Sequence, residues 1–254
     1  MVSQAPPRAD DDTEDPVSCL IHKLRVRDQV TDAEADILRG AVARVEDIPA
    51  GKTLVVPDQK LDQSMLIVSG FVARYKDLSN GQRQITDIHL PGDFTDLHGF
   101  VLKRLEHHIG TLTPIRMAFV PHERLTRISE EQPHLLRMLW LSTLIDSAIQ
   151  RERMLSVGRR SAVARVAHLM CELYTRLSLV NQVDGINFAL PITQMDIADA
   201  TGLTSVHVNR MLREIRDRGL MTFRNATVEI HDLPGLEQLA DFDRSYLFLE
   251  SQPR

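Results

Sequence analysis

The chain has 254 residues, a formal net charge of −5 and 43% hydrophobic residues, which allows one large or two ordinary domains and excludes a wholly disordered protein. Two distant cysteines, Cys19 and Cys171, exclude a disulfide framework and a metal site built from cysteines alone. The first residues lack the apolar stretch of a secretory signal, and no segment approaches the roughly 18 apolar residues that span a bilayer. We therefore expect a soluble, cytoplasmic protein without membrane contacts.

The first 16 residues are rich in aspartate and proline, and we expect residues 1–16 to form a disordered acidic tail. Apolar residues at helical spacing then run from Val17 to about Ala43 and indicate two short helices. The second helix is expected to begin at a cap formed by Thr31, with Glu34 at its third position.

Between Val45 and Val120 the pattern changes to short runs in which apolar and polar residues alternate. Turn sequences separate these runs, among them Asn80-Gly81 and Pro91-Gly92-Asp93-Phe94. Many short strands at this spacing are typical of a sandwich or barrel, so we assign residues 17–130 to a β-rich domain.

A helical pattern follows Pro133 for over 20 residues, and we assign residues 131–157 to one long helix. Six positions spaced by three and four residues form a seam typical of pairing with the same helix of a second copy: Met138, Leu141, Ile145, Ala148, Glu152 and Leu155. A second stripe could face the chain's own β domain: Leu136, Leu139, Trp140 and Leu144. A buried helix in a monomer remains the alternative. A domain hinge is expected at Gly158–Ser161.

Residues 158–232 carry the densest pattern in the chain. Thr193, followed three residues later by Asp196, predicts a capping box, and Gly202 predicts a tight turn after that helix. Thr204 is expected to cap a second helix, which a hairpin follows. This spacing predicts a winged helix-turn-helix whose second helix enters the major groove of DNA.

Outward positions early in the second helix are expected to read base edges: Ser205, Val206, His207, Asn209 and Arg210. Among them, Arg210 can pair with guanine and Asn209 with adenine. Residues expected to reach phosphates surround them: Arg159, Arg160, Thr193, Gln194, Thr204, Arg213 and Arg224. Because any one arginine could equally be a solvated surface charge, the prediction depends on the whole group.

The order of these patterns resembles the Crp/Fnr superfamily of bacterial transcription regulators over about residues 17–231. The resemblance is carried by the long helix and by these segments: Ile48-Pro-Ala-Gly51, Ser69-Gly70, Asn80-Gly81, Pro91-Gly92-Asp93-Phe94 and Ile192–Leu212. It implies an α+β fold with an N-terminal cyclic-nucleotide-binding-like jelly roll (the β-roll), a dimerisation helix and a C-terminal winged helix-turn-helix. It also implies a homodimer on a two-fold symmetric DNA site, and contacts with RNA polymerase. Residues 233–254 lie beyond the resemblance, and we assign them to a C-terminal extension.

The departures from this family concern the effector. Members that bind cyclic AMP carry a Gly-Glu pair soon after the Pro-Gly-Asp-Phe turn and an Arg-Ser pair further on. Here the second stretch reads Glu106–Thr111 without an arginine, so we do not expect cyclic AMP to bind. Cys19 stands alone in the N-terminal region, which excludes a four-cysteine iron–sulfur cluster. In the recognition helix, Val206 stands where relatives usually carry a glutamate, which puts the usual target sequence in doubt.

A candidate effector pocket is expected around the same turn: Phe94, Asp96, Leu97, His98, His107, His108 and Thr111. We assign no metal site, because the histidines show no tight ligand spacing, although a haem or metal ligand remains an alternative.

These patterns predict a homodimeric, sequence-specific DNA-binding regulator without enzymatic activity. The β-roll is expected to be a sensing or purely structural domain. One alternative is a constitutive regulator with the same fold. Another is a ligand-binding signalling protein whose helix-turn-helix contacts a protein.

Overall fold

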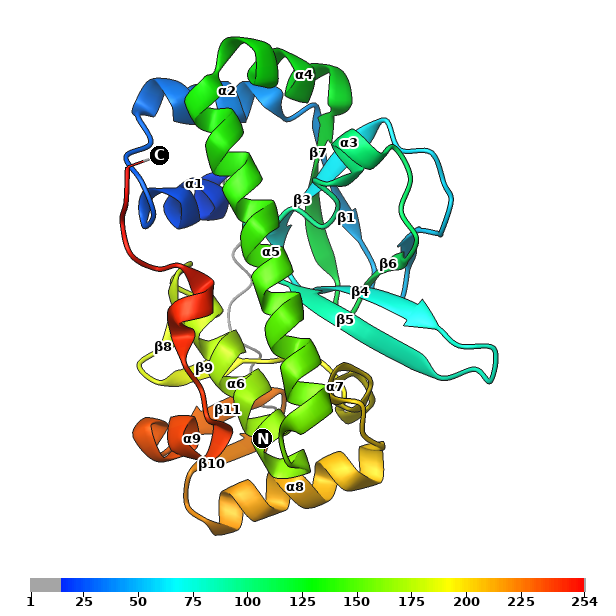
Figure 1. Ribbon diagram of the computed structural model, residues 1–254, viewed down its shortest axis with the longest axis vertical. Helices are drawn as coiled ribbons and strands as arrows, with labels where there is room; N and C mark the ends of the chain where they lie inside the picture. The colour runs from blue at the N-terminus through cyan, green and yellow to red at the C-terminus, as the bar shows by residue number, and fades with distance from the viewer. Residues whose placement is uncertain (1–14, 254) are drawn as a thin grey trace, which may run out of the picture.

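The structure is a computed structural model that describes residues 15–253, so most of the tail predicted at residues 1–16 lies outside the described residues. A long helix, α5, runs through the middle of the molecule, with the β-roll on one side and the C-terminal segment on the other (Figure 1). The α+β class is confirmed, with an antiparallel β domain first, the long helix next and a winged helix-turn-helix last. No described helix combines the length and the apolar character that crossing a bilayer requires.

Two short helices precede the β-roll, as the apolar spacing predicted: α1 (Ser18–Arg25) and α2 (Asp32–Ala41). The capping box of α2 is present, because the Glu34 N–H donates to Thr31 Oγ1 over 3.2 Å and the Thr31 N–H donates to Glu34 Oε2 over 2.9 Å. Apolar residues of both helices pack with Leu135 and Met138 on α5 and so cover one side of the long helix.

The β-roll consists of two antiparallel sheets, ordered β1-β7-β3 and β2-β6-β4-β5. Side chains such as Ile67, Val72 and Met117 are fully buried in its core. The strands are β1 (Arg44–Ile48), β2 (Thr53–Val55), β3 (Gln63–Ser69), β4 (Val72–Asp77), β5 (Arg83–His89), β6 (His108–Thr111) and β7 (Ile115–Pro121), with the short helix α3 (Gly99–Leu102) between β5 and β6.

Helix α4 (His122–Glu131) leads into α5 (Pro133–Arg159), which has 27 residues and begins with proline in its first turn. The helix continues through Gly158, so it ends later than the predicted boundary at 157. The break falls at Arg160, whose backbone is extended, and Ser161 caps the next helix, α6 (Ala162–Ser178). The break between α5 and α6 therefore falls within residues 158–161, and a hinge motion there stays a prediction.

The C-terminal domain packs a small sheet and three helices around one core shared with α6. The strands are β8 (Val183–Asp184), β9 (Asn187–Ala189), β10 (Met221–Arg224) and β11 (Thr227–Ile230), in the order β10-β11-β9-β8. The helices are α7 (Gln194–Thr201), α8 (Ser205–Asp217) and α9 (Leu233–Ala240).

The segment after residue 233 packs back onto the molecule. Leu236 of α9 is fully buried in the core that α9 shares with α6, and the 3-10 helix η1 (Arg244–Leu247) lies against α5. Leu247 is buried between Ile145 and Ile149 of α5. The backbone N–H of Gln252 donates to the Arg27 carbonyl oxygen beyond α1 over 2.9 Å. The C-terminal extension thus links the DNA-binding domain to the N-terminal helices.

The two apolar stripes of α5 differ in burial from what the sequence predicted. Within the predicted partner seam, Met138, Ile145 and Ala148 are buried inside the chain, so they are not available to a second copy. Leu141 also packs partly against the chain's own cores, Glu152 pairs with Arg160, and only Leu155 is largely exposed. The prediction for the three buried residues was wrong because α1 and η1 cover that side of the helix.

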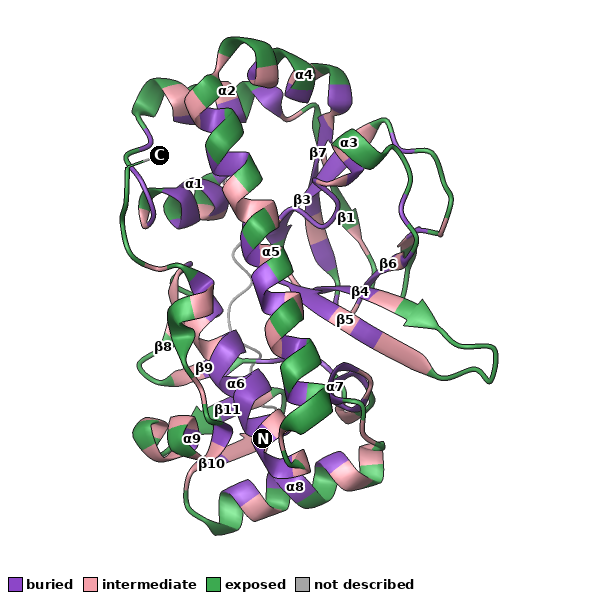
Figure 2. Ribbon diagram, viewed as in Figure 1, coloured by how far each residue is buried: buried purple, intermediate pink, exposed green. Residues whose placement is uncertain are grey.

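The exposed apolar stripe of α5 is the other one. Leu136, Trp140 and Leu144 are 38%, 64% and 50% exposed, whereas Leu139 of the same stripe is buried in the chain. In Figure 2 the middle of α5 alternates between buried and exposed bands, because one face of the helix packs on the chain and the opposite face is open.

Candidate nucleic-acid interface and ligand cleft

The helix-turn-helix forms through the local contacts that its sequence predicted. The Asp196 N–H donates to Thr193 Oγ1 over 3.1 Å, and the Thr193 N–H donates to Asp196 Oδ2 over 2.9 Å, which completes the capping box of α7. The helix ends at Gly202, whose φ of +66° lies in the left-handed region that favours glycine. Thr204 Oγ1 then accepts from the His207 N–H over 3.2 Å and caps α8.

Helix α8 presents one face to the core and the other to solvent. Val208, Met211, Leu212 and Ile215 are buried, whereas Val206 is 80% exposed although its side chain is apolar. Asn209, Arg210 and Arg213 are exposed on the same outer face, and Ser205 and His207 are partly exposed beside them. In Figure 2 the helix α8 lies at the end of the molecule away from the β-roll.

Most residues predicted to reach phosphates are open to solvent, and their contact with phosphate stays a prediction. Arg159, Thr193, Thr204, Arg213 and Arg224 are exposed. Gln194 accepts from Asn209 Nδ2 over 3.3 Å, which ties the start of α7 to the base-reading face of α8.

Arg160 is an exception to this assignment. Its Nη2 donates to Glu152 over 2.6 Å and its Nε donates to the Ala240 carbonyl oxygen over 3.1 Å. The guanidinium therefore stabilises the junction between α5 and α6, and the prediction that it contacts phosphate is not supported by its position.

The wing is a two-residue hairpin between β10 and β11. Asn225 and Ala226 both have positive φ, at 51° and 58°, as a primed turn requires. Arg224 precedes this turn, where an exposed side chain can reach a DNA backbone beside α8.

The predicted effector residues divide into two groups. His98 and His107 line a cleft of about 540 Å³ between the β-roll and α5. The remaining lining residues come from β4, β5, α3, the loop after α3 and α5: Arg74, Lys76, Thr86, Leu102, Glu106, Thr143, Leu144, Asp146, Ser147 and Gln150. Sequence reasoning missed Arg74 and Lys76, although strand alternation places them on the face opposite Ala73 and Tyr75.

The other predicted effector residues do not line this cleft. Phe94 and Leu97 are buried in the N-terminal core, and Asp96 is fully buried, with Oδ1 accepting from the Met65 N–H over 2.7 Å. Thr111 donates to the Pro49 carbonyl oxygen over 2.8 Å. His108 stacks on Tyr75 with ring centroids 5.0 Å apart. These side chains mainly hold the turns of the β-roll together.

Burial sets the charge of the cleft's titratable groups. Desolvation lowers the pKa of His98 to about 4 and also lowers the pKa of His107, and the nearby Arg74 guanidinium acts in the same direction. Both imidazoles are therefore neutral at pH 7. Burial raises the pKa of Asp146 to about 8, which outweighs the opposing effect of Arg74.

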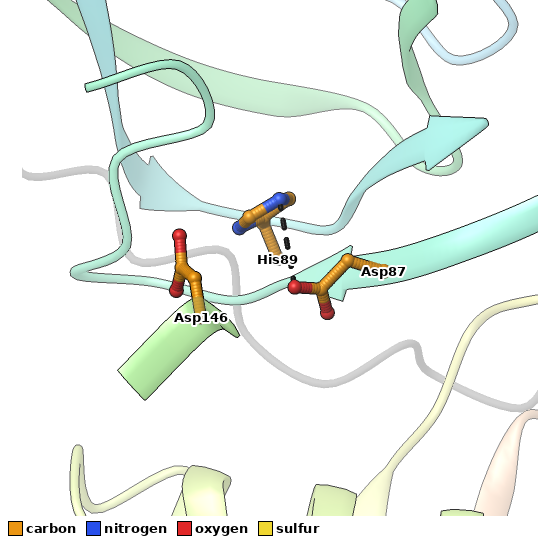
Figure 3. Close-up of side chains that lie close together, drawn as sticks. All are labelled: Asp87, His89 and Asp146. Atoms are coloured by element: carbon orange, nitrogen blue, oxygen red, sulfur yellow. Dashed lines mark ion pairs between the residues drawn. The ribbon is translucent and has the colours of Figure 1, made fainter. Parts of the chain in front are cut away.

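A buried charged cluster lies behind this cleft. Asp87 and His89 of β5 face Asp146 of α5, and the ligand atoms of the three side chains lie within 4.8 Å of one another (Figure 3). His89 is fully buried, and desolvation lowers its pKa to about 3, so the ring is neutral. Guanidinium nitrogens of Arg153 and Arg176 lie 3.7 and 3.6 Å from Asp87 Oδ1.

This arrangement argues against a metal centre. Arg74 also lies 3.8 Å from Asp146, whose raised pKa favours the neutral acid at pH 7, so a divalent cation would face three guanidinium groups and little negative charge. We interpret the cluster as a charged contact that joins β5, α5 and α6. Arg153 and Arg176 complete it by donating to Glu172 of α6 over 2.8 and 2.9 Å.

Comparison with known proteins matches both halves of the chain. Residues 164–239 match the Crp-like helix-turn-helix domain, and residues 45–132 match the cyclic nucleotide-binding domain. The nitrogen fixation regulation protein FixK of Bradyrhizobium diazoefficiens is 31% identical over 169 residues, 64% of this chain and 68% of that protein. The transcriptional regulatory protein btr of Bordetella pertussis is 25% identical over 222 residues, 87% of this chain and 91% of that protein. The solved structure of FixK2 from Bradyrhizobium japonicum has a TM-score of 0.69 at 25% identity, covering 78% of this chain and 97% of that one.

Proposed function

The chain belongs to the Crp/Fnr family of transcription regulators, and from this premise we propose that it binds a two-fold symmetric DNA site as a homodimer, without enzymatic activity. The observation that carries the proposal is the outer face of α8, where Val206, Asn209 and Arg210 are exposed at the start of a capped helix. A helix end of this kind fits the major groove. A regulator that binds DNA and contacts RNA polymerase acts in the cytoplasm.

The exposed residues at the start of α8 have chemical partners on DNA. Arg210 can donate two hydrogen bonds to guanine O6 and N7, and Asn209 can pair with adenine. Val206 offers a methyl contact to thymine, and its 80% exposure in the free protein is otherwise unfavourable for an apolar side chain. Ser205 and His207 flank these contacts, while Arg159, Arg213 and Arg224 reach phosphates.

The second copy is proposed to pack on the open stripe of α5. Leu136 and Trp140 of this stripe, with Leu102 and Val101 of α3, line an apolar hollow of about 480 Å³. An exposed tryptophan at the centre of an apolar surface is typical of a protein interface. Helix pairing along α5 would set the two α8 helices on the same side of the dimer.

We propose that the cleft binds an effector other than cyclic AMP, or that the regulator works without one. The Glu106 carboxylate lines the cleft, in the stretch where cyclic-AMP-binding relatives place an arginine for the phosphate, and a carboxylate repels that group. The chain's two cysteines cannot supply the four thiolates of an iron–sulfur cluster.

The test is selection of the purified, chelator-treated protein against a random DNA library without added ligand. We expect enrichment of a two-fold symmetric site, which would also show that no effector is required. If enrichment appears only after cell extract is added, an effector gates binding. No enrichment under either condition would contradict the proposal and favour a helix-turn-helix that contacts protein.

A further inference from the structure

The hairpin formed by β4 and β5 reaches from the β-roll to the first helix of the helix-turn-helix, α7 (Figure 1). At this contact, Arg83 Nη2 donates to Asp196 Oδ1 over 2.7 Å and Arg83 Nε donates to Asp199 Oδ2 over 2.8 Å. Gln84 Nε2 adds a hydrogen bond to the Asp199 carbonyl oxygen over 2.7 Å. One guanidinium therefore binds two carboxylates whose residues are three positions apart on α7.

This contact is better defined than an ordinary surface ion pair. The side chain of Arg83 is about two-thirds covered, and those of Asp196 and Asp199 are largely covered. Asp196 is also fixed by the capping box, since its other carboxylate oxygen accepts from Thr193. A preorganised carboxylate loses little side-chain entropy when it pairs, so this geometry favours a net contribution that exposed pairs rarely make.

Holding α7 also holds the DNA-reading helix. Buried residues of α7 and α8 share one core, in which Ala198 packs with Val208 and Leu212. The covalent link from α5 to α6 passes through a single residue with extended backbone, Arg160. The orientation of α8 relative to the β-roll therefore depends on side-chain contacts across the domain boundary.

We propose that Arg83 is a positioning residue for the recognition helix: through Asp196 and Asp199 it fixes the helix-turn-helix against the β-roll and so sets the spacing of the two α8 helices in the dimer. The inference rests on the proposed function. The distance between the two α8 helices matters only when the dimer reads two half-sites that lie one helical turn of DNA apart. Arg83 acts through α7, and the outer face of α8 stays open while the contact is made.

The test compares a two-fold symmetric site with a single half-site in full-length variants. Arg83→Glu and Asp199→Arg each place like charges at the contact, and the double variant restores opposite charges between positions 83 and 199, while Asp196 stays unchanged. Arg83→Lys keeps the positive charge but loses the planar guanidinium that donates to both carboxylates. Arg127→Glu is a matched control, because Arg127 is an exposed arginine of α4 whose ion pair with Glu123 is 3.5 Å long.

We expect each single reversal to weaken binding to the symmetric site about tenfold while half-site binding changes less than twofold. The double variant should recover to within about threefold of the wild type, Arg83→Lys should lie between, and Arg127→Glu should bind normally. Equal losses on both DNAs, no recovery in the double variant, or tighter binding after either reversal would overturn the inference.

Hydrogen exchange of the same proteins without DNA separates the two proposals. Amides of residues 194–201 should exchange faster in each single reversal and return towards the wild-type rate in the double variant. If the wild type selects no DNA site but exchange follows this pattern, only the proposed function fails. If the wild type selects a symmetric site and exchange in the single variants is unchanged, the positioning role fails.

Discussion

Replacing Trp140 by alanine is the sharpest test of how two copies assemble. A tryptophan side chain presents about 150–250 Å², and 64% of this residue is exposed on α5, which leaves roughly 130 Å² for a partner to cover. At about 25 cal/mol per Å², burying this area contributes ~3 kcal/mol in each protomer, and a two-fold interface uses it twice. If the partner covers half of this exposed area, replacing Trp140 by alanine lowers the free energy of dimerisation by about 3 kcal/mol.

A loss of about 3 kcal/mol corresponds to a ~100-fold weaker dimer, which sedimentation equilibrium can measure. Leu78→Ala is the control, because Leu78 is also exposed and apolar but lies at the tip of the β4–β5 hairpin. By contrast, Ile145→Asp should unfold the chain rather than dissociate it, because Ile145 is buried against Leu247. An unchanged dimer constant for Trp140→Ala would refute the reasoning and move the interface away from this stripe.

Three further substitutions test other parts of the structure. Arg210→Ala should cost about 1–3 kcal/mol in operator binding and relax the preference at one base position, as selection on a randomised site would show; a uniform loss on all sequences would assign Arg210 to phosphate. Leu247→Ala should lower the free energy of unfolding in urea by about 2–4 kcal/mol, because its fully packed side chain leaves a cavity against α5. Burial raises the pKa of the Asp96 carboxyl to about 7. Between about pH 4 and pH 7 the folded state therefore keeps a proton that the unfolded state has released. The contribution of Asp96 to the free energy of unfolding consequently falls as pH rises from 4 to 7. Asp96→Asn should therefore flatten that pH dependence in urea titrations at pH 5 and 7.5, and an unchanged slope would contradict it.

Local contacts made the DNA-binding domain readable from its sequence. Thr193 and Asp196 interact across three residues, and Gly202 takes a conformation that few other residues tolerate, so their spacing alone indicated helix, turn and helix. The outer face of α8 followed from the same logic, because Val208 and Ile215 mark its inner face by helical period.

Features that depend on distant segments could not be read in this way. Periodicity identified two apolar stripes on α5 but could not say which one α1 and η1 would cover. Arg160 belonged to an arginine pair beside the domain junction, yet Glu152 and the Ala240 carbonyl hold it. Arg83 had no local signal at all, since its partners are 113 and 116 residues away along the chain.

The return of the C-terminal segment to the first helices has a consequence for synthesis. Arg27 Nη2 donates to the Leu247 carbonyl oxygen over 3.0 Å, a contact between residues 220 positions apart. A growing chain exposes its N-terminal helices and α5 about a hundred residues before Leu247 leaves the ribosome, so the side of α5 at Ile145 and Ile149 stays uncovered until η1 has been made. Packing of this side of α5 is therefore completed by η1, a segment made long after α1 and α5.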